Sequence, residues 1–126
     1  MQIDNLDGDF IKADRADFYG RIWIGGKVTQ TKTFISDDGN PGWSISRRVS
    51  GSKVAIRIKI ADDDGGLEDR DDQVDISPKD GKKELDIVLD LKTGRITGDV
   101  TGRRGQTIHV KGGKDGDKAE IWFVIR

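Results

Sequence analysis

The strongest chemical signal in the sequence is the acidic stretch DDDGGLEDRDDQVD, residues 62–75. It contains eight acidic residues and a single basic residue, Arg70. Close carboxylates repel one another by about 1–4 kcal/mol per pair near a protein surface. A bound cation would offset that repulsion, and Gly65 and Gly66 allow the backbone to bend so that carbonyl oxygens can also bind it. The stretch therefore predicts a cation site, and the alternative is a solvated acidic loop.

The residue types favour calcium as this cation. Ca²⁺ accepts about six to eight oxygen ligands in flexible geometry, whereas Mg²⁺ requires a small octahedron and retains waters. The sequence has no cysteine and only one histidine, His109, which excludes thiolate and multi-histidine metal sites. The stretch is not an EF-hand, because placing Gly65 at the sixth loop position puts Ile60 at the first, where Asp is required.

Charge is segregated along the chain, although the net charge is only -1. Residues 18–61 contain eight basic and two acidic residues, in contrast to the acidic stretch that follows them. The overall balance argues against a nucleic-acid partner, which would require a broad basic surface. No apolar run approaches the roughly 20 residues that span a bilayer, and residues 1–10 do not resemble a signal peptide. We therefore expect a soluble chain without a transmembrane segment; its compartment is not indicated.

The elements that position these loops are expected to be short β-strands. The chain has 17 glycines in 126 residues, and 20 of its 23 acidic residues are Asp, which favours turns over helices. The clearest strand is KVAIRIKI, because its isoleucines alternate with polar residues. Residues 84–91 fit a helix as well as a strand, but the flanking glycines favour a strand. The strands are expected at 18–24, 27–35, 43–49, 53–60, 84–91, 96–101, 107–110 and 119–126.

These strands predict an all-β fold, a single antiparallel β-sandwich of about eight strands that covers residues 1–126 as one domain. The last strand, in AEIWFVIR, is expected to be covered on both faces because its apolar run is unbroken. The acidic loops are expected at one end of the sandwich, since residues 62–75 directly follow a confident strand.

Three segments, in order, resemble the calcium-binding C2 domain family over roughly residues 9–76. KADRADFYGRIWI resembles the first calcium loop and the strand that follows it. KTFISDDGNPGW is similar to a Lys-Thr, Asn-Pro, Trp segment of the family, and IKIADDDGGLEDRDDQVDIS is similar to the third calcium loop. The resemblance implies a C2-like sandwich with Ca²⁺ as its cofactor.

Carried over residue by residue, the resemblance implies a set of metal ligands in two loops. Asp17 matches the conserved Asp of loop one, and the alternate pair of loop three matches Asp62 and Asp64. The expected ligands are Asp14, Asp17, Asp62, Asp64 and Asp72.

Some positions differ from the family pattern and leave alternatives open. The first ligand of loop one is either Asp14 or Asp9, at different spacings from Asp17. Loop three is longer than usual, so Asp63, Asp69 or Asp71 can replace one of its ligands. The strand before loop one is expected to be only a few residues long. The C-terminal strand is therefore a candidate for that position, as in the permuted topology of the family.

The resemblance further implies that bound Ca²⁺ bridges the protein to anionic phospholipid. Phe10, Ile11 and Leu67 are candidates for apolar loop tips that contact the membrane, and the alternative is that they fold back over the core. Arg57 and Lys59 resemble the basic face of the family, and the alternative is an ordinary solvated strand face.

Two other classes of function fit parts of the sequence. A Mg²⁺-dependent hydrolase would require a base or orienting group near the metals, and no such motif adjoins the Asp loops, so we expect no enzymatic activity. A secreted structural or carbohydrate-binding sandwich would use Ca²⁺ only to stabilise its loops, with a protein or sugar as partner. The tryptophans at 23, 43 and 122 are expected to pack on the core or the sheets. The chain is expected to be a monomer or a domain of a larger protein.

Overall fold

The computed structural model describes residues 2–3, 6–13, 18–33, 38–39, 42–62, 72–113 and 119–126, with side chains for 18–33, 42–61, 73–113 and 119–126. All regular structure in these ranges is β-strand, in three antiparallel sheets. The first has seven strands: β11 (Gly102–Arg103), β10 (Arg95–Gly98), β9 (Leu85–Asp90), β7 (Lys53–Asp62), β3 (Phe18–Ile24) and β4 (Lys27–Gln30), with β8 (Asp72–Val74) also on β7. The second, of four strands, is β12 (Ile108–Lys111), β13 (Ala119–Ile125), β2 (Leu6–Ala13) and β5 (Asp38–Gly39), and the third pairs β1 (Gln2–Ile3) with β6 (Arg47–Arg48).

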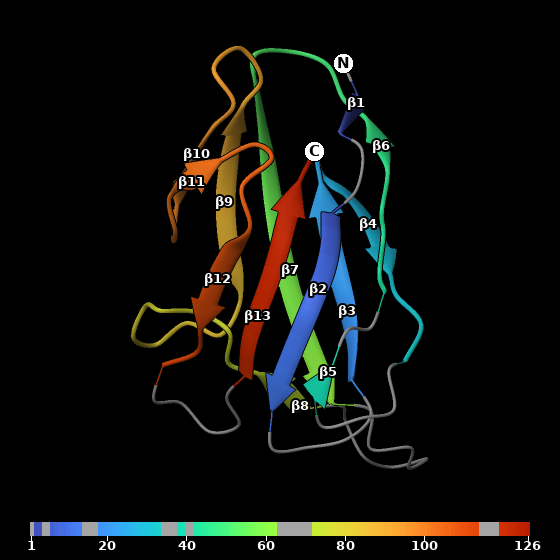
Figure 1. Ribbon diagram of the computed structural model, residues 1–126, viewed down its shortest axis with the longest axis vertical. Helices are drawn as coiled ribbons and strands as arrows, with labels where there is room; N and C mark the ends of the chain where they lie inside the picture. The colour runs from blue at the N-terminus through green and yellow to red at the C-terminus, as the bar shows by residue number, and fades with distance from the viewer. Residues whose placement is uncertain are drawn as a thin grey trace.

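The four-stranded and seven-stranded sheets form two layers around one core (Figure 1). Residues from both contribute to a single cluster of buried side chains, including Ile56 of β7, Leu89 of β9 and Phe123 of β13. The predicted all-β, antiparallel character is confirmed, although the described residues form thirteen strands instead of about eight. No helix capable of crossing a membrane occurs among the described residues.

Strand β7 is the centre of the larger sheet. Its isoleucines at 56, 58 and 60 are at most 3% exposed, whereas Arg57 and Lys59 lie on the outer face, as the alternation in the sequence predicts. One edge of β7 pairs with β3 over its whole second half, and the other is shared by two strands. β9 pairs with residues 53–58 and β8 with residues 60–62.

A two-residue turn joins β3 to β4. Gly25 and Gly26 have φ values of 60° and 85°, as a type I′ turn requires, and the predicted hairpin is confirmed. The second strand of the hairpin is shorter than expected, since β4 ends at Gln30. The hairpin β9–β10 is also formed, which resolves the ambiguity of residues 84–91 in favour of a strand.

The predicted strand at 43–49 is wrong over most of its length. Only Arg47–Arg48 pair as a strand, with β1, while Ile45 and Val49 are 7% and 8% exposed and pack into the core. The indole of Trp43 lies against Gly20 of β3, where an added Cβ would be 3.3 Å from its ring. The alternating apolar residues therefore cover the side of the core that is next to β4.

The N-terminal strand is longer than expected. β2 has eight residues and pairs along its length with β13, so the two are neighbours in the smaller sheet. The pairing shifts register between Trp122 and Phe123, at a bulge. β13 is only partly covered on both faces, because Glu120 and Trp122 are half-buried on the outer face while Ile121 and Phe123 are buried.

Candidate functional site

The strand ends that flank the predicted calcium loops meet at one end of the larger sheet (Figure 1). Phe18, the first residue of β3, pairs with Asp62, the last residue of β7. On its other edge Asp62 pairs with Asp72, the first residue of β8. The pairing therefore aligns Asp72, Asp62 and the residue that follows Asp17 in one row across three strands.

The remaining predicted ligands and one contact residue fall in segments outside the described residues. These are Asp14, Asp17, Asp64 and Leu67, and the alternatives Asp63, Asp69 and Asp71 also lie there. The side chains that are described contain no cluster of three or more His, Asp or Glu residues that could hold a metal.

Phe10 and Ile11 were expected at the tip of a loop, and this prediction is wrong. Both lie within β2, where they pair with Trp122 and Ile121 of β13. The LDGDFIKA sequence extends as a strand because β13 supplies a partner for its backbone groups along its whole length.

The last residue of the acidic stretch, Asp75, is structural. It is fully buried, its Oδ1 accepts a hydrogen bond from the backbone N–H of Ser77 at 2.9 Å, and its carbonyl accepts one from Ala119 at 3.0 Å. Gly112 also bonds to Ala119, and a Cβ on Gly112 would lie 1.9 Å from the Asp75 carbonyl oxygen. This contact ties the segment after β8 to the smaller sheet, next to the loop end.

Arg57 and Lys59, predicted as partner contacts, lie on the outer face of the larger sheet. Arg57 forms a bidentate contact with Asp86 of β9, with distances of 2.6 and 3.2 Å. The Nζ of Lys59 lies 5.5 Å from the centre of the Trp23 ring. The charge of Arg57 is therefore matched within the sheet, and the ammonium of Lys59 rests over an aromatic face.

Lys82 extends this charge network to a second carboxylate. Its ammonium lies 2.8 Å from Asp86 and 2.6 Å from Asp99, and Asp99 also accepts the backbone N–H of Asp86 at 2.8 Å. The hydrogen bond from Arg57 lowers the pKa of Asp86, against the opposing effect of burial. Burial lowers the pKa of Lys82, but its bonds to Asp86 and Asp99 outweigh this and leave the pKa raised. Sequence reasoning missed this network, since only the register of β7 on β9 brings Arg57 opposite Asp86.

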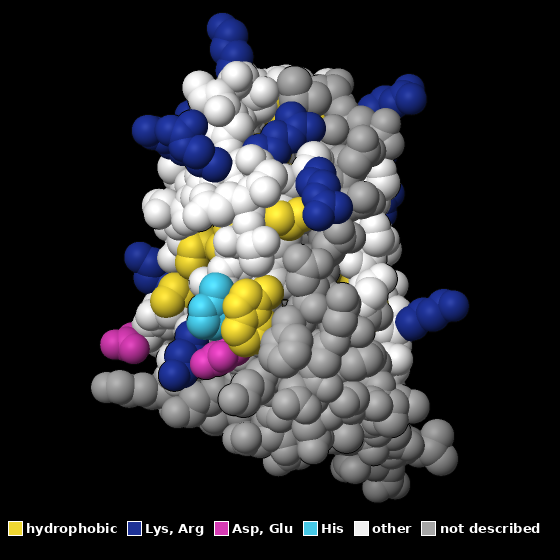
Figure 2. Space-filling model, in the orientation of Figure 1, with side chains coloured by type: hydrophobic (Ala, Val, Ile, Leu, Met, Phe, Trp, Pro, Cys, Tyr) yellow, Lys and Arg dark blue, Asp and Glu magenta, His cyan; other side chains and the backbone are white. Residues whose placement is uncertain are grey.

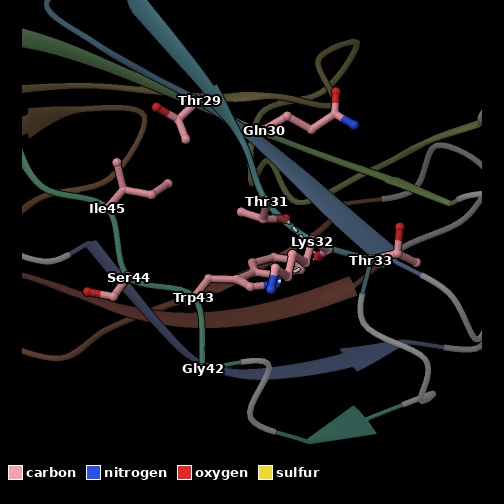
Figure 3. Close-up of a pocket in the computed structure, with 9 residues that line it drawn as sticks. All are labelled: Thr29, Gln30, Thr31, Lys32, Thr33, Gly42, Trp43, Ser44 and Ile45. Carbon is pink, nitrogen blue, oxygen red and sulfur yellow. Dashed lines mark hydrogen bonds between the residues drawn. The ribbon is translucent and has the colours of Figure 1, made fainter.

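An open pocket of about 440 Å³ lies between residues 29–33 and residues 42–45 (Figure 3). The indole of Trp43 reaches across it and donates a hydrogen bond to the Lys32 carbonyl at 3.1 Å. Near its other end, Arg47 donates to the Val28 carbonyl at 3.1 Å and to the hydroxyl of Thr29. The contacts join β4 and the residues just after it to the segment that covers the core, so these polar groups have a structural role.

His109 and Trp122 form an aromatic pair on the outer face of the smaller sheet. Their rings are stacked, with centres 4.3 Å apart and planes 2° from parallel. Glu120 lies 3.6 Å from both His109 and Lys111. Figure 2 shows the histidine against a hydrophobic side chain on this face, with acidic and basic side chains beside it. All three tryptophans are thus half-buried and pack on a sheet or the core edge.

Comparison with protein-family models and with curated proteins finds no match for this chain.

Proposed function

We propose that the chain is a non-enzymatic Ca²⁺-binding module, a C2-like β-sandwich whose Asp-rich loops bind calcium at one end. The observation that carries the proposal is the row formed by Asp72, Asp62 and Phe18 across β8, β7 and β3. It brings the ends of two acidic segments, 14–17 and 62–72, to adjacent strands of one sheet. Asp64 and Asp14 are assigned as ligands from the sequence.

The electrostatics of this row favour a bound cation. Directly opposite residues of an antiparallel pair share one face, and like charges at such positions destabilise the sheet. Asp62 and Asp72 are opposite each other, and the sequence between them offers only one basic residue, Arg70. A hard divalent cation would convert this repulsion into ligation by oxygen atoms.

We further propose that the bound ion docks the loop end to anionic phospholipid. The support is the charge pattern: bound Ca²⁺ reduces the negative charge of the acidic loop end, and lipid phosphates can then complete the coordination of the ion. Leu67 belongs to the same acidic stretch of the sequence and is the proposed apolar contact with the membrane. Phe10 and Ile11 have less support for this role, because they belong to β2.

The first test is ion-linked stability. A ligand that binds only the folded state at a hundred times its Kd adds about 2.7 kcal/mol to the free energy of unfolding. For a domain of this size the melting temperature should rise by about 5–10 °C. We expect this shift with Ca²⁺ and a much smaller one with Mg²⁺, measured by melting in chelator and in each ion. Equal shifts, or none, would contradict a specific calcium site.

The second test uses Asp64→Asn, with Lys59→Gln as a charge-change control outside the loops. In chelator the variant should be neutral or more stable by up to about 1 kcal/mol, because repulsion is relieved. In excess Ca²⁺ it should be less stable than the unmodified protein, because an anionic ligand is lost. Lys59→Gln should show no such reversal. If Asp64→Asn is equally destabilised in both conditions, Asp64 is a loop-capping residue.

Docking is tested separately by pelleting with vesicles of phosphatidylserine and phosphatidylcholine. The protein should sediment with the anionic vesicles in Ca²⁺ and remain in solution in chelator or with neutral vesicles. If Ca²⁺ raises the melting temperature but the protein does not sediment with the vesicles, the proposed metal site is supported and the proposed lipid partner is wrong.

A further inference from the structure

The outer face of the larger sheet has a hollow of about 510 Å³, away from the loop end. It spans β3, β7, β9 and the end of β10. The hollow is deepest at Ala55, whose short side chain lies on the exposed face of β7 between the long side chains of Lys53 and Arg57. Small-molecule sites in proteins have volumes of about 300–1,000 Å³, so the hollow is of a size that binds a small ligand. The lining residues used below are Trp23, Ala55, Arg57, Asp86, Val88 and Asp99.

One wall of the hollow is the indole of Trp23. Trp23 pairs with Arg57, so Lys59 and Ala55 lie on its two sides along β7. Lys59 rests over the ring, and the hollow lies on the Ala55 side. Because the cation on one side holds the ring in place, Trp23 presents a fixed apolar surface. Val88 continues this surface, and the adjacent Val28 is 49% exposed, the one large hydrophobic side chain so exposed among those described.

Next to Trp23, the same side of the hollow continues as a polar row, because Trp23 pairs with Arg57 and Arg57 pairs with Asp86. The bidentate contact with Asp86 uses two of the five N–H donors of Arg57 and fixes the plane in which the others point. Asp99, only 12% exposed at its side chain, is held by Lys82 and by the Asp86 backbone. Donors and acceptors are therefore presented together, in positions that do not need to be ordered when a ligand binds.

The charges around the hollow decide which ligands fit. Arg57 and Lys82 carry two positive charges, and Asp86 and Asp99 carry two negative ones, so the network is neutral. A phosphate would meet two carboxylates, and a cation would meet a guanidinium and an ammonium. A neutral ligand with many hydroxyl groups can use both kinds of partner, while its C–H face packs on an aromatic ring.

We propose that this hollow, over Ala55 and Val88 and beside the row of Trp23, Arg57 and Asp86, is a binding site for a neutral oligosaccharide. A sugar ring packs against the indole and directs vicinal hydroxyls to Arg57, Asp86 and Asp99. The site uses no residue of the loop end, so its affinity is independent of Ca²⁺. The test of this proposal is therefore independent of the calcium proposal.

The test is a titration of the ¹⁵N-labelled protein with cellotetraose, xylotetraose, mannotetraose and chitotetraose, in Ca²⁺ and in chelator. We expect saturable shifts of the amides of Ala55, Arg57 and Val88 with at least one sugar, alike in both conditions. Saturation with none of the four sugars, or shifts that map elsewhere, would overturn the proposal. A Ca²⁺ requirement would also overturn it, since the hollow contains no metal ligand.

Matched variants separate the site from general effects on the fold. Trp23→Ala should weaken binding about tenfold, because an aromatic contact is worth about 1.4 kcal/mol. Trp122→Ala, which removes a half-buried tryptophan from the outer face of the other sheet, should leave the affinity unchanged. If Trp23→Ala does not fold, Ala55→Leu fills the floor at an exposed position without removing packing. Unchanged binding by Ala55→Leu, or equal weakening by the two tryptophan variants, would refute the assignment.

Discussion

Two pairs of carboxylates adjoin the same edge of β7, and they differ in how their repulsion is relieved. Asp86 and Asp99 share the ammonium of Lys82, and Arg57 holds Asp86 from the other side. Asp62 and Asp72 are directly opposite each other within a stretch that contains one basic residue. Lys82 and Arg57 neutralise the first pair, whereas the calcium proposal assigns a cation from solution to the second.

On the calcium proposal, the difference between the two pairs is whether the chain supplies its own cations to a carboxylate pair. Asp86 and Asp62 are strand residues of the same sheet, in β9 and β7, so strand geometry alone does not distinguish the two pairs. The distinction comes from the side chain that the register brings opposite: Arg57 for Asp86, but Asp72 for Asp62. The following variants test this comparison.

The largest effect is expected where the loop end is anchored. Gly112→Ala places a Cβ 1.9 Å from the Asp75 carbonyl oxygen, so the backbones must separate. We expect a loss of about 3 kcal/mol in the free energy of unfolding, at the upper end for overpacking. Denaturant unfolding measures it. Gly113→Ala, whose added Cβ would have its nearest contact at 3.4 Å, is the matched control and should cost far less. Equal losses would show that the Asp75 contact is not the anchor.

The protein should lose stability when the ammonium that Asp86 and Asp99 share is removed. Lys82→Met leaves Asp86 and Asp99 close together without the ammonium between them. We expect a loss of about 1–2 kcal/mol, between the values for exposed and buried ion pairs. Lys83→Met changes the same charge at the next residue and is the control in parallel unfolding curves. If both variants lose the same amount, the effect is one of net charge and not of this contact.

Removal of one carboxylate from each pair should have opposite signs. In chelator, Asp62→Asn should raise the free energy of unfolding by up to about 1 kcal/mol, because a like-charge contact is relieved. Asp86→Asn should lower it by about 1 kcal/mol, because Arg57 loses its carboxylate partner and Lys82 loses one of its two. Urea unfolding of both variants at low salt measures the difference. The same sign for both would remove the basis of the comparison.

The smallest effect is in acid. The pKa of Asp86 is lower in the folded state than in the unfolded chain, so the folded state binds fewer protons near pH 4. Its stabilisation is complete above the unfolded pKa and is lost as the pH falls through the folded value. Solvent screening of this half-exposed pair limits the loss to about 1 kcal/mol or less.

Arg57→Gln isolates this contribution from that of other carboxylates. The pKa of Asp90 is lowered as well, by backbone hydrogen bonds from Thr93 and Lys92. The variant should therefore be less stable at pH 6 but lose less stability between about pH 5 and pH 2. Unfolding curves across this range measure both slopes. An unchanged acid slope would assign the loss to carboxylates other than Asp86.

Much of the strand content could be predicted from local pattern. The alternation in KVAIRIKI and the glycines after Ile24 specify β7 and the β3–β4 turn, because each depends on residues next to one another. The strand at 43–49 failed because alternation also fits a segment that packs three apolar side chains against the edge of a core. β2 was underestimated because two aspartates and a glycine interrupt its apolar residues.

The candidate sites also differ in how far local sequence predicts them. The acidic stretch is visible in the sequence because its residues are contiguous, although the burial of Asp75 is not, since it depends on Gly112 and Ala119. The Arg57–Asp86 contact joins residues 29 positions apart. Only the register of two distant strands brings such residues together, and one sequence does not specify that register.

The position of β7 also has a kinetic consequence. The hairpins β3–β4 and β9–β10 each join neighbours in the chain, but β7 joins one hairpin to the other. Ile56 pairs with Ile24 and with Ile87, so about 30 residues of chain must be closed on each side before the centre of the sheet exists. Folding should therefore be slow, on the millisecond-to-second scale of all-β domains, with its barrier at the docking of two preformed hairpins onto β7.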